Sequence, residues 1–350
     1  MLGNRTMRWL AFALLALAVV GGPQSALAAD SGQQQAQRQE SQPLNNAPIW
    51  RDVRGGDINQ YQTTQVRGIE TNVLVESGGE VWRQIRNGPI TVYGGWLLVI
   101  MLLALGAFHV TKGPIKLHEK PTGRMMQRFS AWDRIVHWTT AVSFMILAIT
   151  GLITLFGKHV LLPVTGYTLF SWLAQLSKNL HNFVGPLFAV CTLLMIVTFI
   201  RDNWPKAHDW LWVRKFGGLM SGEHVPSDRF NAGEKIWFWA GVTLLGIVSI
   251  VTGFVLDFAN FGQGRLLMQQ MNVIHGVSAA LFVAMGIAHI YLGTVGVEGA
   301  YETMRSGMTD ETWAKEHHEY WYNEAKRKGA AAPGGAPSTA PASPMKEGWK

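Results

Sequence analysis

Two histidines share one long apolar segment of this chain. His275 and His289 lie fourteen residues apart between Met271 and Val297. Fourteen residues of α-helix advance about 21 Å and complete almost four turns, so both imidazoles point to nearly the same side, at two depths of an apolar layer roughly 30 Å thick. One helix can therefore supply a ligand to two separate sites.

Two more histidines, His137 and His181, lie near the ends of other long apolar segments. The acidic residue deepest in these segments, Asp257, is near an end, and the single cysteine, Cys191, is typical of a small buried apolar residue. Zinc and non-haem iron sites usually recruit carboxylates or thiolates, and covalent haem attachment requires C-x-x-C-H. Four histidines without such partners indicate two b-type haems, each held by two axial histidines.

Each histidine taken alone also fits a purely structural role, because a polar residue in a membrane helix can hydrogen-bond a neighbouring helix. A haem-free membrane anchor therefore stays an alternative of a different class. An absorption spectrum of purified membranes distinguishes the two.

Composition indicates a membrane protein. The chain is 48% hydrophobic and 15% charged, and it contains 15 Trp, as expected of interfacial aromatic belts. The formal charge of +7 does not indicate nucleic-acid binding, because the basic residues concentrate in particular connections between apolar segments. These residues indicate topology.

Residues 1–28 have the pattern of a secretory signal peptide, with Arg5 and Arg8 before a short apolar run and Ala26-Leu27-Ala28 as the cleavage pattern. An uncleaved anchor helix is the alternative. Residues 29–89 begin as a polar linker that cannot bury a core and continue as a mixed segment. We expect this periplasmic linker and docking segment to order against a partner.

Five apolar segments are long enough to span a membrane, at residues 90–110, 135–156, 180–200, 236–258 and 271–297. The predicted fold class is an all-α membrane protein: one additional N-terminal transmembrane helix, a connection at 111–134, and a four-helix di-haem cytochrome b core at 135–297. A tail at 298–350 follows, expected to be disordered from about 329.

Orientation follows from the basic residues. The connections at 111–134 and 201–235 and the tail carry nineteen Lys and Arg, against nine on the other side. The positive-inside rule makes the first side cytoplasmic. We therefore expect a bacterial inner-membrane protein with a periplasmic mature N-terminus and a cytoplasmic C-terminus.

This topology pairs the histidines by depth. His137 and His289 share the cytoplasmic depth, and His181 and His275 share the periplasmic depth. Gly151, fourteen residues after His137, reaches the periplasmic depth on the same helix face, where a missing side chain would admit a porphyrin. Ordinary helix packing is the alternative for this glycine.

Three further residues have open roles. Arg134 lies three residues before His137 on the same helix face and could pair with a haem propionate or simply mark a basic flank. His317 and His318 in the tail are expected to form a solvated helix end or a subunit contact.

Several of these motifs together resemble the gamma, or cytochrome b, subunit of membrane-bound respiratory formate dehydrogenases. The resemblance runs from about residue 129 to 327 and rests on Asp133-Arg134-Ile135-Val136-His137-Trp138, Leu180-His181, Ile274-His275, Ala288-His289-Ile290-Tyr291 and the loop Phe230-Asn231-Ala232-Gly233-Glu234-Lys235. The chain departs from the shortest family members by its signal, its periplasmic segment and its extra first helix.

The resemblance implies a periplasmic iron–sulfur beta subunit and an alpha subunit that oxidises formate at molybdenum or tungsten. It also implies a quinone site near the cytoplasmic haem, beside Asn231, Gly233 and His289. This chain has no recognisable formate site of its own, so it would be the quinone-reducing, electron-transfer subunit. The haem residues alone leave open the cytochrome b subunit of a nickel–iron hydrogenase or a thiosulfate or polysulfide reductase; the Asn-Ala-Gly loop favours formate dehydrogenase.

Asn231 and Gly233 also fit a structural role, in which Asn231 caps the following helix and Gly233 permits its entry turn.

The topology is tested with reporter fusions. Alkaline phosphatase should be active after Gln60 and Gln263 and inactive after Lys215 and Lys326, because it folds only outside the cytoplasm. Activity at Lys215 would overturn the orientation.

Overall fold

The computed structural model describes residues 77–218, 222 and 225–330. The expected signal peptide, most of the expected linker and nearly all of the segment expected to be disordered lie outside these residues.

In the part of the chain that the structure describes, five helical segments are long and apolar enough to cross a membrane: Gly78–Lys112, Ala131–Val160, Leu162–Phe199, Ala232–Asp257 and Arg265–Gly296. Their outer faces leave large apolar side chains uncovered, as a lipid environment requires; Phe183 is 83% exposed. The predicted all-α membrane fold with four core helices and one additional N-terminal helix is confirmed.

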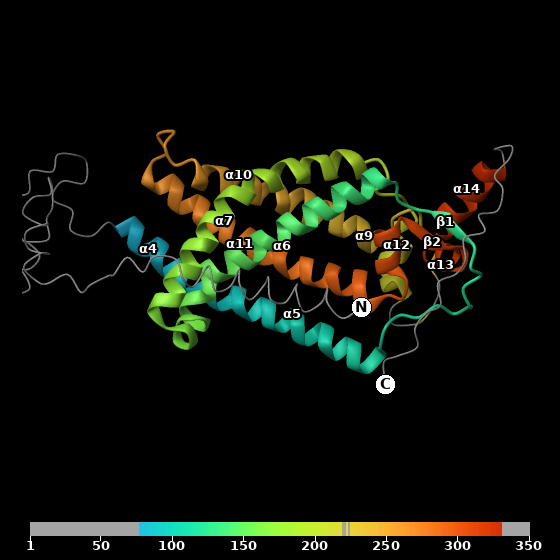
Figure 1. Cartoon of the computed structure of the whole chain (residues 1–350), viewed down its shortest axis with the longest axis horizontal. Coiled ribbons are helices and arrows are strands. Elements are labelled where there is room, and N and C mark those ends of the chain that lie inside the picture. Colours follow the sequence, from blue (N-terminus) through green and yellow to red (C-terminus); the bar gives the residue numbers. More distant parts are fainter. Residues whose placement is uncertain (1–76, 219–221, 223–224, 331–350) are drawn as a thin grey trace, which may run out of the picture. The chain divides into compact units, whose positions relative to one another are not determined.

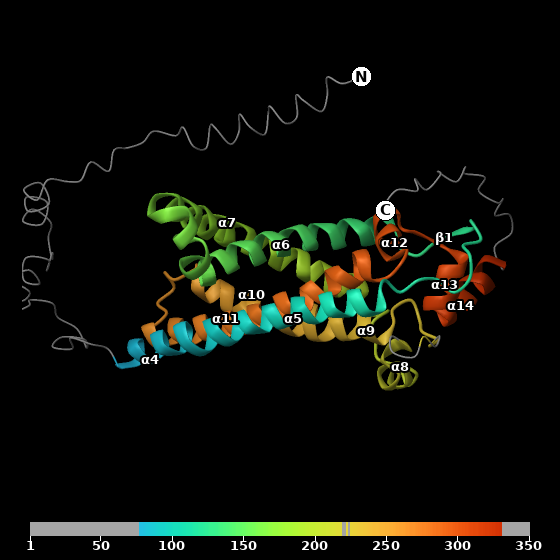
Figure 2. The same ribbon diagram turned by 90° about the horizontal axis from the view of Figure 1, so that it is seen from below.

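Helix α11 (Arg265–Tyr291) is the element around which the bundle is arranged (Figure 1). Helix α6 (Ala131–Val160) packs mainly on α7 (Leu162–Phe199), and α10 (Gly246–Asp257) packs on α11 and α7. Helix α5 (Thr91–Lys112) runs along α11, as both views show (Figure 2). The additional helix therefore belongs to the same bundle as the core.

The first span begins before the expected boundary at residue 90. Helix α4 (Ser77–Ile85) continues through the π-helical turn η1 (Arg86–Ile90) into α5. Pro89 lies inside η1 and does not end the helix, because the wider turn accommodates its missing N–H. Trp82 Nε1 donates to Asn272 Oδ1 at 3.1 Å, so α4 is anchored to α11.

Residues 157–179, which lie between two of the predicted spans, are mostly helical. Helix α6 extends to Val160 and α7 begins at Leu162, with a break at Gly166, whose φ is +73°. Most of this stretch is apolar or helix-favouring, so it extends the helices with a kink at the glycine.

Three basic connections meet at one end of the bundle, which we call the tail end. Strand β1 (Met125–Gln127) pairs antiparallel with β2 (Met308–Asp310), which ties the connection before α6 to the tail. The other elements at this end are α8 (Asp209–Arg214), η2 (Phe216–Gly218), α12 (Ala300–Ser306), α13 (Glu311–His317) and α14 (Glu319–Ala330). The fourth span also starts here, as α9 (Ala232–Ile236) followed by the π-helix η3 (Trp237–Leu245), and the fifth ends here in the π-helix η4 (Leu292–Gly296).

Candidate functional site: two histidine pairs and a cavity

The structure brings together the two histidines of each predicted pair. The rings of His137 on α6 and His289 on α11 have centroids 6.3 Å apart, and the rings of His181 on α7 and His275 on α11 have centroids 6.1 Å apart. Helix α11 therefore contributes one imidazole to each pair, and only the first pair lies near the tail end.

Threonine hydroxyls orient the rings of the second pair. Thr150 Oγ1 lies 2.8 Å from His181 Nδ1, and Thr252 Oγ1 lies 3.0 Å from His275 Nδ1. Each hydroxyl also donates to a carbonyl of its own helix, so its oxygen accepts the Nδ1 proton of the histidine. This fixes the tautomer in which Nε2 carries the free lone pair, as a metal-ligating histidine requires.

A glycine follows each of these threonines and faces the same ring. A Cβ added at Gly151 would lie 3.4 Å from His181 Cε1, and a Cβ added at Gly253 would lie 3.4 Å from His275 Cε1. Of the Thr-Gly sequences in the chain, one on α6 and one on α10 thus lie beside the two imidazoles of the second pair. A larger side chain at either glycine would project toward the space beside the ring, where a porphyrin edge would lie.

The rings of the first pair have different surroundings. His137 Nδ1 is buried and has no hydrogen-bond partner among the described residues. The His289 ring stacks on Trp237, with centroids 4.8 Å apart and planes 13° from parallel. Gly286, one turn before His289, leaves space that the Phe144 ring fills: a Cβ there would lie 2.8 Å from it.

An aromatic layer separates the two pairs. Phe144, Phe188 and Phe282 each lie seven residues, or two helical turns, from a histidine of the pairs. Phe282 contacts the other two rings at centroid distances of 4.8 and 6.2 Å, and it is 5% exposed. The space between the two pairs is therefore apolar and closely packed.

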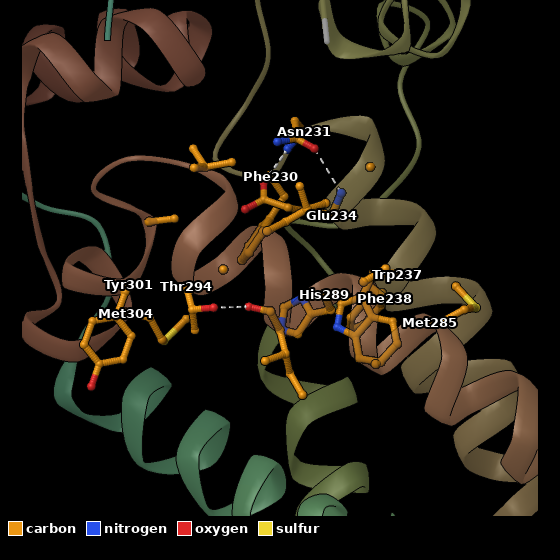
Figure 3. A pocket seen from close by; sticks show the side chains of 18 of the residues that line it. Phe230, Asn231, Glu234, Trp237, Phe238, Met285, His289, Thr294, Tyr301 and Met304 are labelled. Atoms are coloured by element: carbon orange, nitrogen blue, oxygen red, sulfur yellow. Dashed lines mark hydrogen bonds between the residues drawn. The ribbon is translucent and has the colours of Figure 1, made fainter. Parts of the chain in front are cut away.

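A cavity of about 1240 Å³ opens around the first pair and extends to the tail. Figure 3 shows Asn231 and Glu234 of α9 on one side of it and His289 on the other. Asn231 caps α9: its Oδ1 accepts from Glu234 N at 3.0 Å, and its own N–H donates to Glu234 Oε2 at 2.8 Å. Among the described residues no partner takes the side-chain Nδ2 of Asn231, which leaves an amide donor at the cavity.

Gly233 lies beneath an indole. A Cβ there would lie 2.7 Å from the Trp212 ring, and both residues line the cavity. In this structure a tryptophan ring therefore lies directly against Gly233, one of the residues beside which the resemblance implies a quinone.

Arg134 does not line the cavity. It donates to the Arg305 carbonyl at 2.9 Å, and its Nε is buried without a partner among the described residues. Arg128 lines the cavity instead: it is 6% exposed and donates to Glu234 Oε1 at 3.0 Å. Burial lowers the pKa of Arg128, and the Glu234 carboxylate opposes that shift. The cavity wall therefore contains a compensated ion pair between Arg128, which lies before the second span, and Glu234 at the start of the fourth.

The expectation for His318 was wrong. It is 1% exposed, and its Nδ1 donates to the Asp228 carbonyl at 2.6 Å, which places Nε2 3.9 Å from Glu234 Oε2. Burial also lowers the pKa of the neighbouring His317. The β1–β2 pairing brings this part of the tail over the cavity, so these histidines are interior residues.

The described residues contain no group of three or more His, Cys, Asp or Glu that could hold a bare metal ion. A haem iron needs only two axial ligands from the protein. Because an imidazole nitrogen binds a metal at about 2.0 Å and sits roughly 1 Å from its ring centroid, two rings flanking one metal have centroids about 6 Å apart. Both pairs have this separation.

Residues 128–307 match the family model of the prokaryotic cytochrome b561. The chain belongs to this family. The match covers α6 to α12, including all four histidines. The chain is therefore an integral membrane protein that carries haem b, and its half-buried histidine pairs fit that group.

Two relatives from Escherichia coli (strain K12) are similar to this cytochrome b561. The cytochrome b556(Fdn) subunit of the nitrate-inducible formate dehydrogenase is 28% identical over 209 residues, which is 58% of this chain and 93% of the relative. The cytochrome b556(fdo) subunit of formate dehydrogenase is also 28% identical over 209 residues, which is 57% of this chain and 93% of the relative. The resemblance found from the motifs is confirmed.

Sequence reasoning missed several residues of this site. Thr150, Thr252 and Gly253 contact the second pair, and Trp212 and Arg128 line the cavity. The available signal for the first three was that a Thr-Gly sequence occurs inside two of the predicted apolar spans. The last two carried no signal, because their positions depend on tertiary contacts.

The threonine contacts lead to a test. Thr252→Val removes the acceptor of the His275 Nδ1 proton at nearly constant volume. The outer partner of a metal-ligating histidine typically contributes 10- to 100-fold to metal affinity, so we expect about tenfold weaker haem binding in a titration of the haem-depleted protein.

Thr252→Ser is the matched control, since it keeps the hydroxyl and should bind haem nearly as tightly as the wild type. Equal affinities for Val and Ser at this position would show that the hydrogen bond does not help to hold the ligand.

Proposed function

We propose that this cytochrome b561 is the membrane electron-transfer subunit of a formate dehydrogenase complex and passes electrons to membrane quinone. The two relatives named as formate dehydrogenase cytochrome b556 subunits support the complex. The observation that carries the proposal is the fourteen-residue spacing on α11, which gives this helix one histidine in each of two pairs. The ring centroids are 6.1 Å apart in one pair and 6.3 Å apart in the other.

Each pair holds one haem b in this proposal. His137 and His289 would be the axial ligands near the tail end, and His181 and His275 those near the opposite end. When bound, haem b supplies one-electron transfer. The chain itself holds the ligand tautomers with Thr150 and Thr252 and keeps water out between the pairs with its aromatic layer.

The tail end faces the cytoplasm of a bacterial inner membrane in this proposal. The three connections richest in Lys and Arg meet there, which is the arrangement that the positive-inside rule expects. An iron–sulfur beta subunit would then dock at the periplasmic end and receive electrons from an alpha subunit that oxidises formate at molybdenum or tungsten.

Moving an electron inward against a negative-inside potential costs about 2.3 kcal/mol per 100 mV for a full crossing. The difference in potential between formate and quinone would drive this step. Quinone reduction with proton uptake from the cytoplasm would conserve the energy as a proton gradient.

The quinone would bind in the cavity beside His289. Asn231 offers its side-chain Nδ2 to a quinone carbonyl while its Oδ1 caps α9, so the cap and the ligand contact use different atoms of one side chain. Gly233 would act through the Trp212 ring that it admits.

Haem content tests the ligand assignment. We expect two low-spin b haems per wild-type chain, loss of one haem in His275→Ala, and loss of the other in His289→Ala, as measured by the pyridine haemochrome assay. His109→Ala, which changes a histidine outside both pairs, should keep two haems. One haem or none in the wild-type chain would refute the proposal.

Quinone reoxidation tests the cavity. Asn231→Asp keeps the cap, because Asp caps as well as Asn, but it replaces the amide donor with a charge that repels a quinone carbonyl. We expect both haems and their reduction by formate to be retained, and reoxidation by quinone to slow roughly tenfold, about the loss of one hydrogen bond.

Asn231→Ser separates the two effects, since it also caps α9 without adding a charge. It should slow reoxidation less than Asp does. If the Asp variant reoxidises its haems at the wild-type rate, the quinone binds elsewhere.

A further inference from the structure

Helix α5 lies outside the region that matches the family model, yet it contributes to the wall of the cavity. The match begins at residue 128, whereas α5 ends at Lys112. Met101, Phe108 and Lys112 lie on one face of α5, seven and four residues apart, and all three line the cavity that contains His289 and Asn231. The additional helix is thus part of the site.

Helix α5 is attached to α11 close to His289. His109 Nδ1 lies 3.1 Å from the hydroxyl of Tyr291, two residues beyond His289, and the Phe108 ring packs edge-on against the same tyrosine. The chain that follows α5 remains attached to the end of the fifth span, because Ile115 N donates to the Gly296 carbonyl at 2.9 Å. The tail end of α5 is therefore fixed relative to α11.

Helices α5 and α6 meet at the opposite end and separate toward the tail end. Near the opposite end, a Cβ at Gly95 of α5 would lie 3.4 Å from the Phe156 ring of α6. Figure 1 shows the two helices diverging from there toward the end that carries α12 to α14, with α11 running between them. Their contacts with each other are few, whereas those between α5 and α11 are many.

Three of the α6 residues that line the cavity also face outward. Val142 and Ile149 line it and are 57% and 52% exposed, and Met145 between them is likewise exposed. A side chain that borders the cavity and the outside of the bundle at the same time marks an opening. Since α5 and α6 both span the membrane, this opening faces lipid rather than water.

The cavity is large enough for two occupants. Its volume of about 1240 Å³ exceeds the roughly 300–1,000 Å³ of a pocket for one small ligand. A haem between His137 and His289 would take one part, and the remainder connects the polar loop at Asn231 with the apolar opening. A molecule with a polar ring and a long apolar tail fits this space, with its ring at the polar loop and its tail at the apolar opening.

We propose that α5 and α6 form a lateral opening through which an isoprenoid quinone enters from the lipid, and that its tail lies between Met101 and Phe108 on one side and Val142 and Met145 on the other. This inference rests on the proposed quinone function of the cavity. It gives the additional helix a role: α5 shapes the entrance, and the His109–Tyr291 contact holds it in position.

A bulky residue in the opening tests the route. Val142→Trp fills the space between α5 and α6 from an exposed position. In the purified complex, we expect the KM for a long-tailed quinone to rise at least about fivefold, with unchanged haem content and unchanged haem reduction by formate. The quinone used is ubiquinone or menaquinone, whichever the wild-type complex reduces faster. The KM for the same headgroup without its tail is measured in parallel, and we expect this KM to rise less.

The matched control is Leu103→Trp, which adds the same bulk on α5 at a residue that is 66% exposed and does not line the cavity. It should leave the KM unchanged. An unchanged KM in Val142→Trp would overturn the route. Loss of a haem from that variant would also overturn it, because this result would mean that the haem edge, rather than a quinone tail, fills the opening.

A second measurement does not depend on a variant. A quinone with a photoreactive azide on the first isoprene unit should label peptides of α5 around residues 101–108 and of α6 around 138–149. Labelling confined to α7 or α10 would overturn the proposal.

The two hypotheses fail in different ways. Normal haem reoxidation in Asn231→Asp removes the quinone site from the cavity. Slow reoxidation in Asn231→Asp together with a normal KM in Val142→Trp keeps the site and rejects the entrance.

Discussion

The arrangement of this bundle depends on the need to satisfy imidazole nitrogens inside a membrane. A ring nitrogen without a partner is costly in an apolar layer, so each histidine needs a hydrogen bond or a metal. Helix α11 imposes this demand at two depths, where α7 and α6 bring His181 and His137 beside its histidines. At the second pair the threonines of α6 and α10 accept the Nδ1 protons, whereas His137 Nδ1 of the first pair has no hydrogen-bond partner among the described residues.

The same physics explains how much the sequence could predict. The spans, their depth and the pairing of four histidines follow from hydropathy and from the rise of a helix, which are local properties. The ends of the spans do not. Pro89 continues a helix because a π-turn accommodates it, and residues 157–179, which lie between two predicted spans, are mostly helical. Hydropathy alone does not distinguish these cases.

The parts of the site that escaped prediction depend on contacts between distant segments. Gly151 was predicted because it shares a helix with His137, whereas Gly253 lies on α10 and acquires its meaning only when α10 packs on α11. Arg128 and His318 reach the cavity through the pairing of β1 with β2, between residues more than 180 positions apart. No periodicity within either segment indicates that pairing.

Asn231 shows why a structural role and a binding role need not compete. The capping box uses Oδ1 and the backbone N–H of this residue and thereby fixes its χ angles, which directs Nδ2. A donor whose orientation is already set loses little rotamer entropy when it binds, so the cap makes the amide a better ligand contact. The Arg128–Glu234 ion pair extends this effect, because it holds the carboxylate that completes the box. Rigidity at the start of α9 and recognition in the cavity therefore arise from the same hydrogen bonds.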